Sequence, residues 1–438
     1  MLILKLFGDI VSYISSSLWY IFLPFIIFIA IFINIKTRKF FNVISKKDKD
    51  KWNLLNIKAS LSISLSSKIG TGAIIGVLAA MWKTSQNGIG GESIVLWVII
   101  GMCFLVPVTY SEVLFSQITK KNPRKFIDHY INKTMGAIYA VSLVVLYSFG
   151  FVGFQMTGIQ SVINIFSKQN FGYEFTQNNR LFFIVLPIII IVTIIVITKN
   201  YKLFINTLGS LVALIVLAYG LLFISFLILT KDFIFQYIDY IWKDFINIKS
   251  VSIGMPIGFI IGLQRIIQIS ETGLGTSALA SSDSKNSPRR EALLQTISTI
   301  ITTFIAVIIT SYIFTYGRYN LDNISLTGNG FERISSYLYS VISVTGYLGE
   351  GIIIMFFILS GLTTVLGSFH FLNTTISISE NRRIAFYIVL ISLSGLLSIS
   401  NFDVIFDAAD LLMFIVASIN MSAIFIFINK DIKSFKIN

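Results

Sequence analysis

Charge, cysteine and histidine are all scarce in this sequence. Only 13% of the 438 residues are charged and 55% are hydrophobic, whereas roughly a quarter of the residues in a soluble domain are charged. The low charge excludes an ordinary soluble protein. The single cysteine, Cys103, excludes a disulfide framework and a cysteine-based metal site. No His, Asp or Glu cluster has zinc spacing and no nucleophile–base motif is present, so we expect neither an enzyme nor a bound cofactor.

Apolar stretches long enough to cross a bilayer, about 20 residues each, recur along the whole chain. Between them there is no polar stretch that could build a soluble core of its own. The sequence therefore predicts an all-α, polytopic membrane protein with eleven transmembrane helices. The predicted helices are residues 14–35, 55–82, 92–118, 136–166, 181–198, 203–229, 252–282, 291–316, 344–376, 384–400 and 408–428.

The distribution of basic residues predicts the orientation of these helices. Of the 34 Lys and Arg residues, 22 lie in the connections after the odd-numbered helices and in the C-terminal tail, 9 lie on the opposite side, and 3 lie within helices. Basic residues prefer the cytoplasmic side. We therefore expect a multi-pass protein of the cell (inner) membrane, with the N-terminus outside and the C-terminus in the cytoplasm. Lipid headgroups, rather than nucleic acid, then account for the net charge of +13.

Two similar glycine-containing motifs indicate an internal repeat. The second predicted helix contains "SKIGTG" and the seventh contains "SETGLG", and each begins a set of five helices. Because five is odd, the two sets enter the membrane from opposite faces, which predicts an inverted five-plus-five repeat. The corresponding domains are residues 1–53 with an extra helix and a basic loop, 54–230 with the first repeat, and 251–438 with the second repeat and tail.

The glycines predict that both helices are broken in the middle of the membrane. Unpaired backbone in lipid costs several kcal/mol per group, so breaks persist only where they are buried or line a cavity. Helix N-termini at a break attract an anion, and unwound carbonyls attract a cation. A simple packing role for the glycines, at the spacing of Gly72 and Gly76, is the alternative. Lys68, Arg265 and Glu271 lie nearest the predicted midplane, and an ion pair of Glu271 with either basic residue would be purely structural.

Three stretches resemble the alanine or glycine:cation symporter family, which is part of the amino acid–polyamine–organocation group with a leucine-transporter-type fold. They are "SLSSKIGTGAIIGV" with its continuation to "YSE", "GLQRIIQISETGLGTSALASSDSKNSPRREALLQ", and the weaker "AADLLMFIVASINMSAI". Together they extend over most of the chain. The second is the most specific, since the family pattern there is similar to F-Q-R-x-x-F-S-N-E-A-G-x-G-S.

The resemblance implies two groups of site residues. It implies contacts with the substrate from the two breaks and from the fourth predicted helix: Gly70, Thr71, Gly72, Ala73, Gln160, Ser270, Glu271, Thr272 and Gly273. It implies a sodium site made by the carbonyls of Ser66, Ile69 and Ser360 and the hydroxyls of Thr363 and Thr364. Lys68 and Arg265 place charge near this site. The spacing of the last three sodium ligands puts them on one helix face.

Several positions depart from the family pattern. Ala73 and Ser270 replace asparagines, Thr272 replaces an alanine, and Thr302 replaces an aspartate. These changes remove side-chain ligands for a cation or an ammonium group. The resemblance still implies symport of a small neutral amino acid such as alanine or glycine with a monovalent cation, most simply Na⁺. Two alternatives stay open: a transporter of the same fold that is proton-coupled, a uniporter or an exchanger, and a membrane sensor or interaction protein on a degenerate transporter scaffold.

Overall fold

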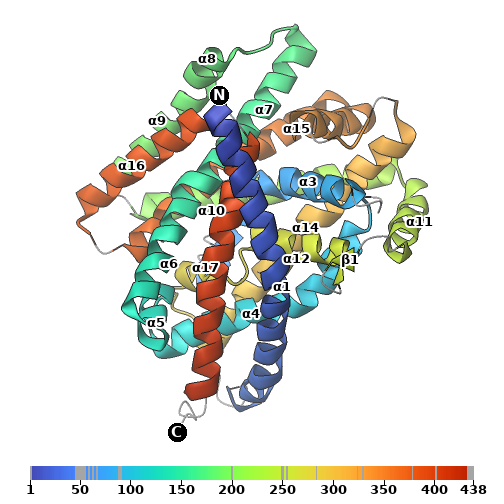
Figure 1. Ribbon diagram of the computed structural model, residues 1–438. Helices are drawn as coiled ribbons and strands as arrows, with labels where there is room; N and C mark the ends of the chain where they lie inside the picture. Colours follow the sequence, from blue (N-terminus) through green and yellow to red (C-terminus); the bar gives the residue numbers. More distant parts are fainter. Residues whose placement is uncertain are drawn as a thin grey trace.

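Helices make up almost all of the computed structural model (Figure 1). The structure describes residues 2–44, 56–57, 60–61, 64–65, 68–86, 91–198, 201–247, 251–252, 255–282, 284–322, 324–327, 330–376, 378–399 and 402–431. The elements in the first half are α1 (Leu2–Ile44), α3 (Gly72–Gln86), α4 (Ile94–Thr119), α5 (Pro123–Tyr130), α6 (Lys133–Val145), the π-helical η1 (Leu146–Phe151), α7 (Val152–Phe171), α8 (Gln177–Arg180), the π-helical η2 (Leu181–Val185), α9 (Leu186–Ile197) and α10 (Tyr201–Leu229).

The second half begins with a helix that follows a sharp turn and with a minimal strand pair. The elements are α11 (Phe233–Ile246), β1 (Val251–Ser252), β2 (Met255–Pro256), α12 (Ile257–Ser270), α13 (Thr276–Ala280), α14 (Pro288–Asn320), α15 (Gly330–Thr375), α16 (Glu380–Leu397) and α17 (Phe402–Lys430). The two strands pair antiparallel over two residues each. All of the larger elements are helices, as expected where backbone groups must bond within their own segment.

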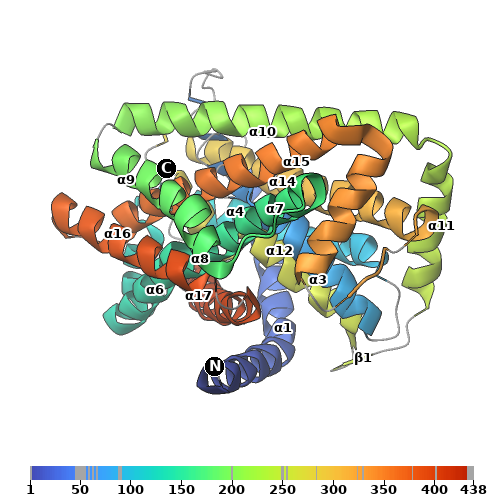
Figure 2. The same cartoon turned by 90° about the horizontal axis from the view of Figure 1, so that it is seen from above.

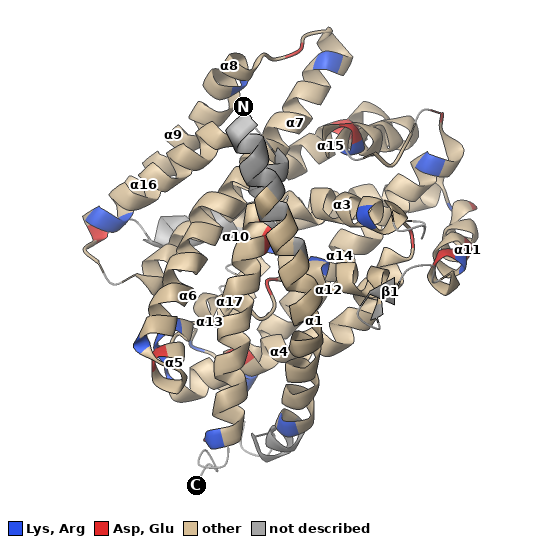
Figure 3. Ribbon diagram, viewed as in Figure 1, with Lys and Arg blue, Asp and Glu red and all other residues tan. Residues whose placement is uncertain are grey.

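The helices have the length and composition of membrane spans, which confirms the prediction of a multi-span helical protein. In the described part of the chain, seven helical segments qualify as spans, or eight if α10 and α11 are counted as one bent span. Figure 3 shows that most of the length of the helices carries no charged residue and that Lys, Arg, Asp and Glu lie mainly near helix ends. The count of eleven spans and the inverted repeat stay predictions.

Two hydrophobic cores organise the helices. The smaller core joins α7, α9, α15 and α16 through residues such as Met156, Val192 and Ile391. The larger core joins α3, α4, α12, α14 and α17, and α15 contributes to both cores. The first helix, α1, packs along α17 and α4, and these helices lie side by side in Figure 1. The indole Nε1 of Trp19 donates to the Asp410 carbonyl at 3.2 Å, which anchors α1 to α17.

Two helices are interrupted where the glycine motifs predict a break. The first interruption leaves Ile69 to Thr71 outside regular helix before α3 begins at Gly72. The second separates α12 from α13 between Glu271 and Gly275. Three residues of the second break are left-handed: Glu271 at φ 57°, and Gly273 and Gly275 at φ 82°. A side chain in this conformation is strained, so the neighbours of Glu271 must stabilise the break.

Gly275 is required at the second break for two separate reasons. Its φ of 82° disfavours a side chain, and a Cβ there would clash with the Tyr139 hydroxyl and lie 3.0 Å from Pro123 Cβ. We expect Gly275→Ala to lower the free energy of unfolding by about 1–3 kcal/mol, measured by thermal unfolding in detergent. The control is Gly220→Ala on α10, where a Cβ meets no heavy atom within 4 Å and alanine favours helix. Equal melting temperatures for the two variants would contradict this explanation.

Candidate functional site

Side chains of neighbouring helices form hydrogen bonds with the unwound backbone of the second break. Glu112 on α4 is buried, and its Oε2 accepts hydrogen bonds from the Gly275 amide and from Asn420 Nδ2, both at 3.3 Å. Asn420 on α17 also donates to the Gly273 carbonyl at 2.9 Å. The break therefore has partners on two different helices, which hold it open without leaving its polar groups in an apolar surrounding.

Two further contacts position the same break. Tyr139 on α6 donates its hydroxyl to the Leu274 carbonyl at 2.7 Å. On the other side, the Thr272 hydroxyl lies 2.9 Å from that of Thr109 and 2.8 Å from that of Ser270. Ser270 and Thr272, two of the predicted substrate contacts, thus form hydrogen bonds within the second broken helix and toward α4.

A side-chain amide fills the first break. Gln155 on α7 accepts a hydrogen bond from the Thr71 amide at its Oε1, at 2.7 Å. A Cβ at Gly70 would lie 2.6 Å from Gln155 Nε2 and 2.9 Å from Thr364 Oγ1. A side chain at this position is therefore incompatible with the contacts of the break. α3 begins directly afterwards, so its N-terminal amides lie beside this opening.

A small cavity lies between the two breaks. Its volume is about 30 Å³, enough for small polar groups or ordered water. Its lining combines both breaks with α7 and α15: Lys68, Gly70, Gly72, Ala73, Phe151, Phe154, Gln155, Gln268, Ile269, Glu271 and Thr364. Four of the predicted substrate residues are therefore brought together here, namely Gly70, Gly72, Ala73 and Glu271.

Gln160 lies elsewhere on α7. Its Nε2 donates to Ser398 Oγ at 2.7 Å, next to α16, and it is not among the residues that line the cavity. Gln155, five residues earlier, occupies the position beside the substrate residues that the resemblance suggested for Gln160. The sequence could not single out Gln155, since it is one of several polar residues on this helix, with Thr157, Gln160, Ser161 and Asn164.

The predicted sodium ligands form a second group beside the cavity. Thr364 Oγ1 donates to the Ser360 carbonyl at 3.0 Å and lies 3.5 Å from the Ile69 carbonyl, while Thr363 Oγ1 donates to the Ser360 carbonyl at 2.9 Å. Ser360 Oγ is buried and has no partner among the described residues. This all-oxygen donor set fits a small hard cation. Ser66, the remaining predicted ligand, lies outside the described residues.

The buried charges near the cavity come from three different helical segments. Lys68 donates to Thr299 Oγ1 on α14 at 3.0 Å. Arg265 forms an ion pair with Asp410 on α17 at 3.4 Å, with both side chains almost fully buried. Arg265 also donates to Gln268, which lines the cavity. Sequence reasoning missed Asp410, although a carboxylate inside an apolar stretch is a signal in itself.

The cavity is therefore lined by groups of both polarities. Lys68 and the N-terminus of α3 lie against it, and so do Glu271 and the C-terminus of α12. Helix N-termini favour negative charge and C-termini favour positive charge. Such a lining can receive both charges of a small zwitterion, and the oxygen donor set beside it can receive a cation.

Known proteins resemble this chain along nearly its whole length. The model of the sodium:alanine symporter family matches residues 4–437. The amino-acid carrier protein AlsT of Bacillus subtilis is 23% identical over 454 residues, covering 98% of this chain and 92% of the relative. The probable sodium/glutamine symporter GlnT of the same organism is 22% identical over 382 residues, covering 83% and 74%.

A solved structure matches the fold. It is the substrate-bound, outward-open state of a Na⁺-coupled sialic acid symporter, with a TM-score of 0.54 and 13% sequence identity, covering 88% of this chain and 81% of that chain. At this identity the match concerns the fold alone.

The Arg265–Asp410 pair generates a prediction about stability. Asp410→Leu removes the carboxylate that faces a fully buried guanidinium, and we expect a loss of about 3 kcal/mol, seen as a lower melting temperature in detergent. The double variant Arg265→Met with Asp410→Leu removes both charges and should recover most of that loss. A single variant as stable as the double variant would show that the pair has no electrostatic role. Asp239→Asn, in the exposed pair with Lys243, is the control and should leave the melting temperature unchanged.

Proposed function

This chain belongs to the sodium:alanine symporter family, and from that premise we propose that it imports a small neutral amino acid, such as alanine or glycine, together with Na⁺. The observation that carries the proposal is the polarity of the cavity. The α3 N-terminus and Lys68 would receive the substrate carboxylate, and Glu271 with the α12 C-terminus would receive its ammonium group.

The remaining lining of the cavity favours a substrate with an uncharged side chain. Phe151, Phe154 and Ile269 are apolar, and Gln155, Gln268 and Thr364 are polar but uncharged. The charged groups of the lining are already matched by the ammonium and carboxylate groups of an amino acid. A Cβ at Gly72 would lie 3.3 Å from a Phe154 ring carbon, so the Phe154 ring lies close to the α3 backbone at this point. An extra charge on the substrate would find no further oppositely charged group in this lining.

The sodium ion would be held by the oxygens of Ile69, Ser360, Thr363 and Thr364. Ile69 belongs to the first break and directly precedes Gly70, which lines the substrate cavity. The two ligands would therefore share one short segment of unwound backbone. Ordering that segment for one ligand favours the other, which is the physical basis of coupling.

Alternating access belongs to the same proposal. The helices would rock around the cavity, whose lining residues Ala73, Phe151, Phe154 and Ile269 belong to the larger core. The eleven spans, the inverted repeat, the three domains at 1–53, 54–230 and 251–438, and the outside N-terminus with a cytoplasmic C-terminus are part of the same proposal. Anionic lipid headgroups then face the basic loops.

Uptake into proteoliposomes tests the function. We expect labelled alanine or glycine to accumulate when an inward sodium gradient is imposed, and not when potassium at the same ionic strength replaces sodium. Equal accumulation in both would overturn sodium coupling and favour an alternative in which the buried Lys68 ammonium supplies the cation. Binding without any uptake would overturn transport and favour a sensor.

The sodium site generates its own prediction. Thr363→Ala and Thr364→Ala each remove one hydroxyl oxygen from the donor set, and we expect the apparent sodium affinity of uptake to fall about tenfold, equivalent to about 1.4 kcal/mol. The control is Thr374→Ala on the same helix, whose hydroxyl makes the same type of bond, to the His370 carbonyl at 3.1 Å, outside the site. The site is wrong if all three variants keep the wild-type sodium dependence.

A further inference from the structure

The helix α11 has an exposed apolar face that the proposed transport site does not use. Phe235, Ile238, Trp242 and Ile246 are 81%, 56%, 56% and 60% exposed. Their spacing of three, four and four residues places them on one side of the helix. Four large apolar side chains on one short helix are too many for a surface in contact with water.

A second face of α11 is anchored to the protein. The Tyr237 hydroxyl lies 2.6 Å from Ser311 Oγ on α14. The Tyr240 ring stacks on Tyr319 with centroids 3.9 Å apart. The Phe245 ring lies 4.5 Å from that of Trp97 on α4. These contacts fix the rotation of α11 about its own axis, so the exposed apolar face has a defined direction.

A third face of α11 is polar and exposed. Asp239 and Lys243 form an ion pair at 2.6 Å with side chains that are 50% and 70% exposed, and Gln236 is exposed beside them. The helix thus has one face toward the protein, one apolar face and one polar face. This is the pattern of a helix that lies in a membrane interface, where apolar groups face the acyl chains and charges face water.

The orientation of α11 agrees with this position. It is bent by 101° from the preceding segment Leu214–Leu229 of α10, and Figure 2 shows it turned along the side of the molecule at the end of α10. If α10 crosses the membrane, α11 runs nearly parallel to the membrane plane. The last turns of α10 also carry exposed apolar residues, at Ile224, Ile228 and Leu229.

We propose that α11 lies in the membrane interface and that its apolar face, formed by Phe235, Ile238, Trp242 and Ile246, contacts lipid at the headgroup–acyl boundary. This inference rests on membrane insertion and not on the proposed transport function. Tryptophan is favoured at this depth. Full insertion of α11 as half of a bent span would place the Asp239–Lys243 pair in hydrocarbon, which is costly.

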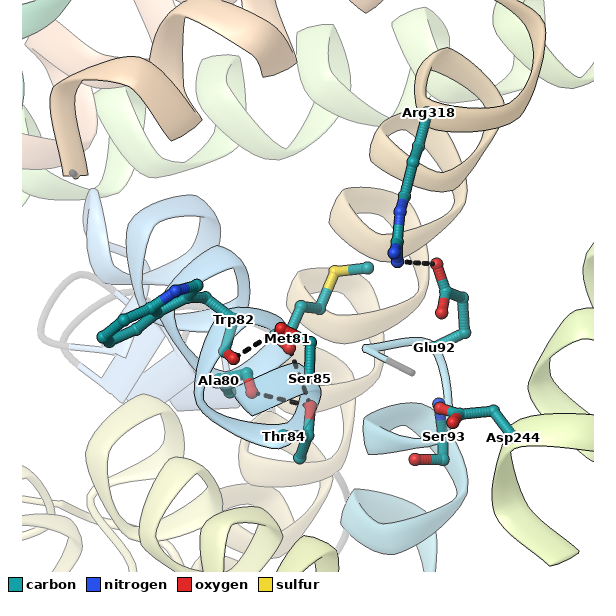
Figure 4. A network of polar contacts seen from close by, with 9 residues as sticks. All are labelled: Ala80, Met81, Trp82, Thr84, Ser85, Glu92, Ser93, Asp244 and Arg318. Atoms are coloured by element: carbon teal, nitrogen blue, oxygen red, sulfur yellow. Dashed lines mark hydrogen bonds and ion pairs between the residues drawn. The ribbon is translucent and has the colours of Figure 1, made fainter. Parts of the chain in front are cut away.

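This position would connect the lipid to the transport helices. Asp244 Oδ2 on α11 accepts a hydrogen bond from the Ser93 amide at 2.6 Å. The adjacent Glu92 forms an ion pair with Arg318 of α14 at 2.9 Å. Figure 4 shows both contacts beside the last turn of α3. A shift of α11 relative to the membrane would therefore act on the N-terminal end of α4, which Ser93 caps, and through Glu92 on α14.

Spin labelling of the full-length protein in proteoliposomes tests the inference. Cys103→Ser removes the one cysteine, and single cysteines then replace Phe235, Ile238 and Trp242 on the apolar face or Gln236, Asp239 and Lys243 on the polar face. The labels are compared for collision with oxygen, which concentrates in lipid, and with a water-soluble nickel complex. Leu221→Cys, on the exposed side of α10, is the lipid reference.

We expect labels at 235, 238 and 242 to resemble the lipid reference and labels at 236, 239 and 243 to favour the nickel complex at least several-fold. Nickel access at all six positions would overturn the proposal, because α11 would then lie in water. Protection from nickel at all six would overturn it equally, because α11 would then be the inserted half of a bent span.

Discussion

The structure depends on one constraint: backbone that leaves a helix inside a membrane must find hydrogen-bond partners from other helices. The breaks at Ile69–Thr71 and Glu271–Gly275 meet this constraint through Gln155, Glu112 and Asn420. An unsatisfied group at that depth costs several kcal/mol. Because the three partners lie on α7, α4 and α17, the packing of those helices determines where the breaks lie and how far they open.

Because the two breaks both line the cavity, backbone groups at helix ends form much of the site and few charged side chains are needed. The N-terminus of α3 and the C-terminus of α12 supply opposite partial charges, and Lys68 and Glu271 reinforce them. The oxygens of α15 lie next to the same unwound segment. In the proposed function, substrate and cation share one piece of backbone, so that ordering it for one ligand would favour the other.

Local patterns in the sequence are sufficient to predict the breaks, the multi-span helical class and the family. The i, i+3, i+4 spacing also places Ser360, Thr363 and Thr364 on one helix face. The partners across helices are not predictable in this way, because the contacts of Gln155 and Asp410 depend on how whole helices pack. For the same reason the sequence leaves open which group faces Arg265.

The most direct test of this account is the affinity for alanine or glycine, measured by calorimetry on the purified protein at a series of sodium concentrations. If the two ligands share the first break, the dissociation constant of the amino acid must fall as sodium rises, and by linkage sodium must bind more tightly by the same factor when the amino acid is present. An amino-acid affinity that is the same with and without sodium, at constant ionic strength, would contradict the account.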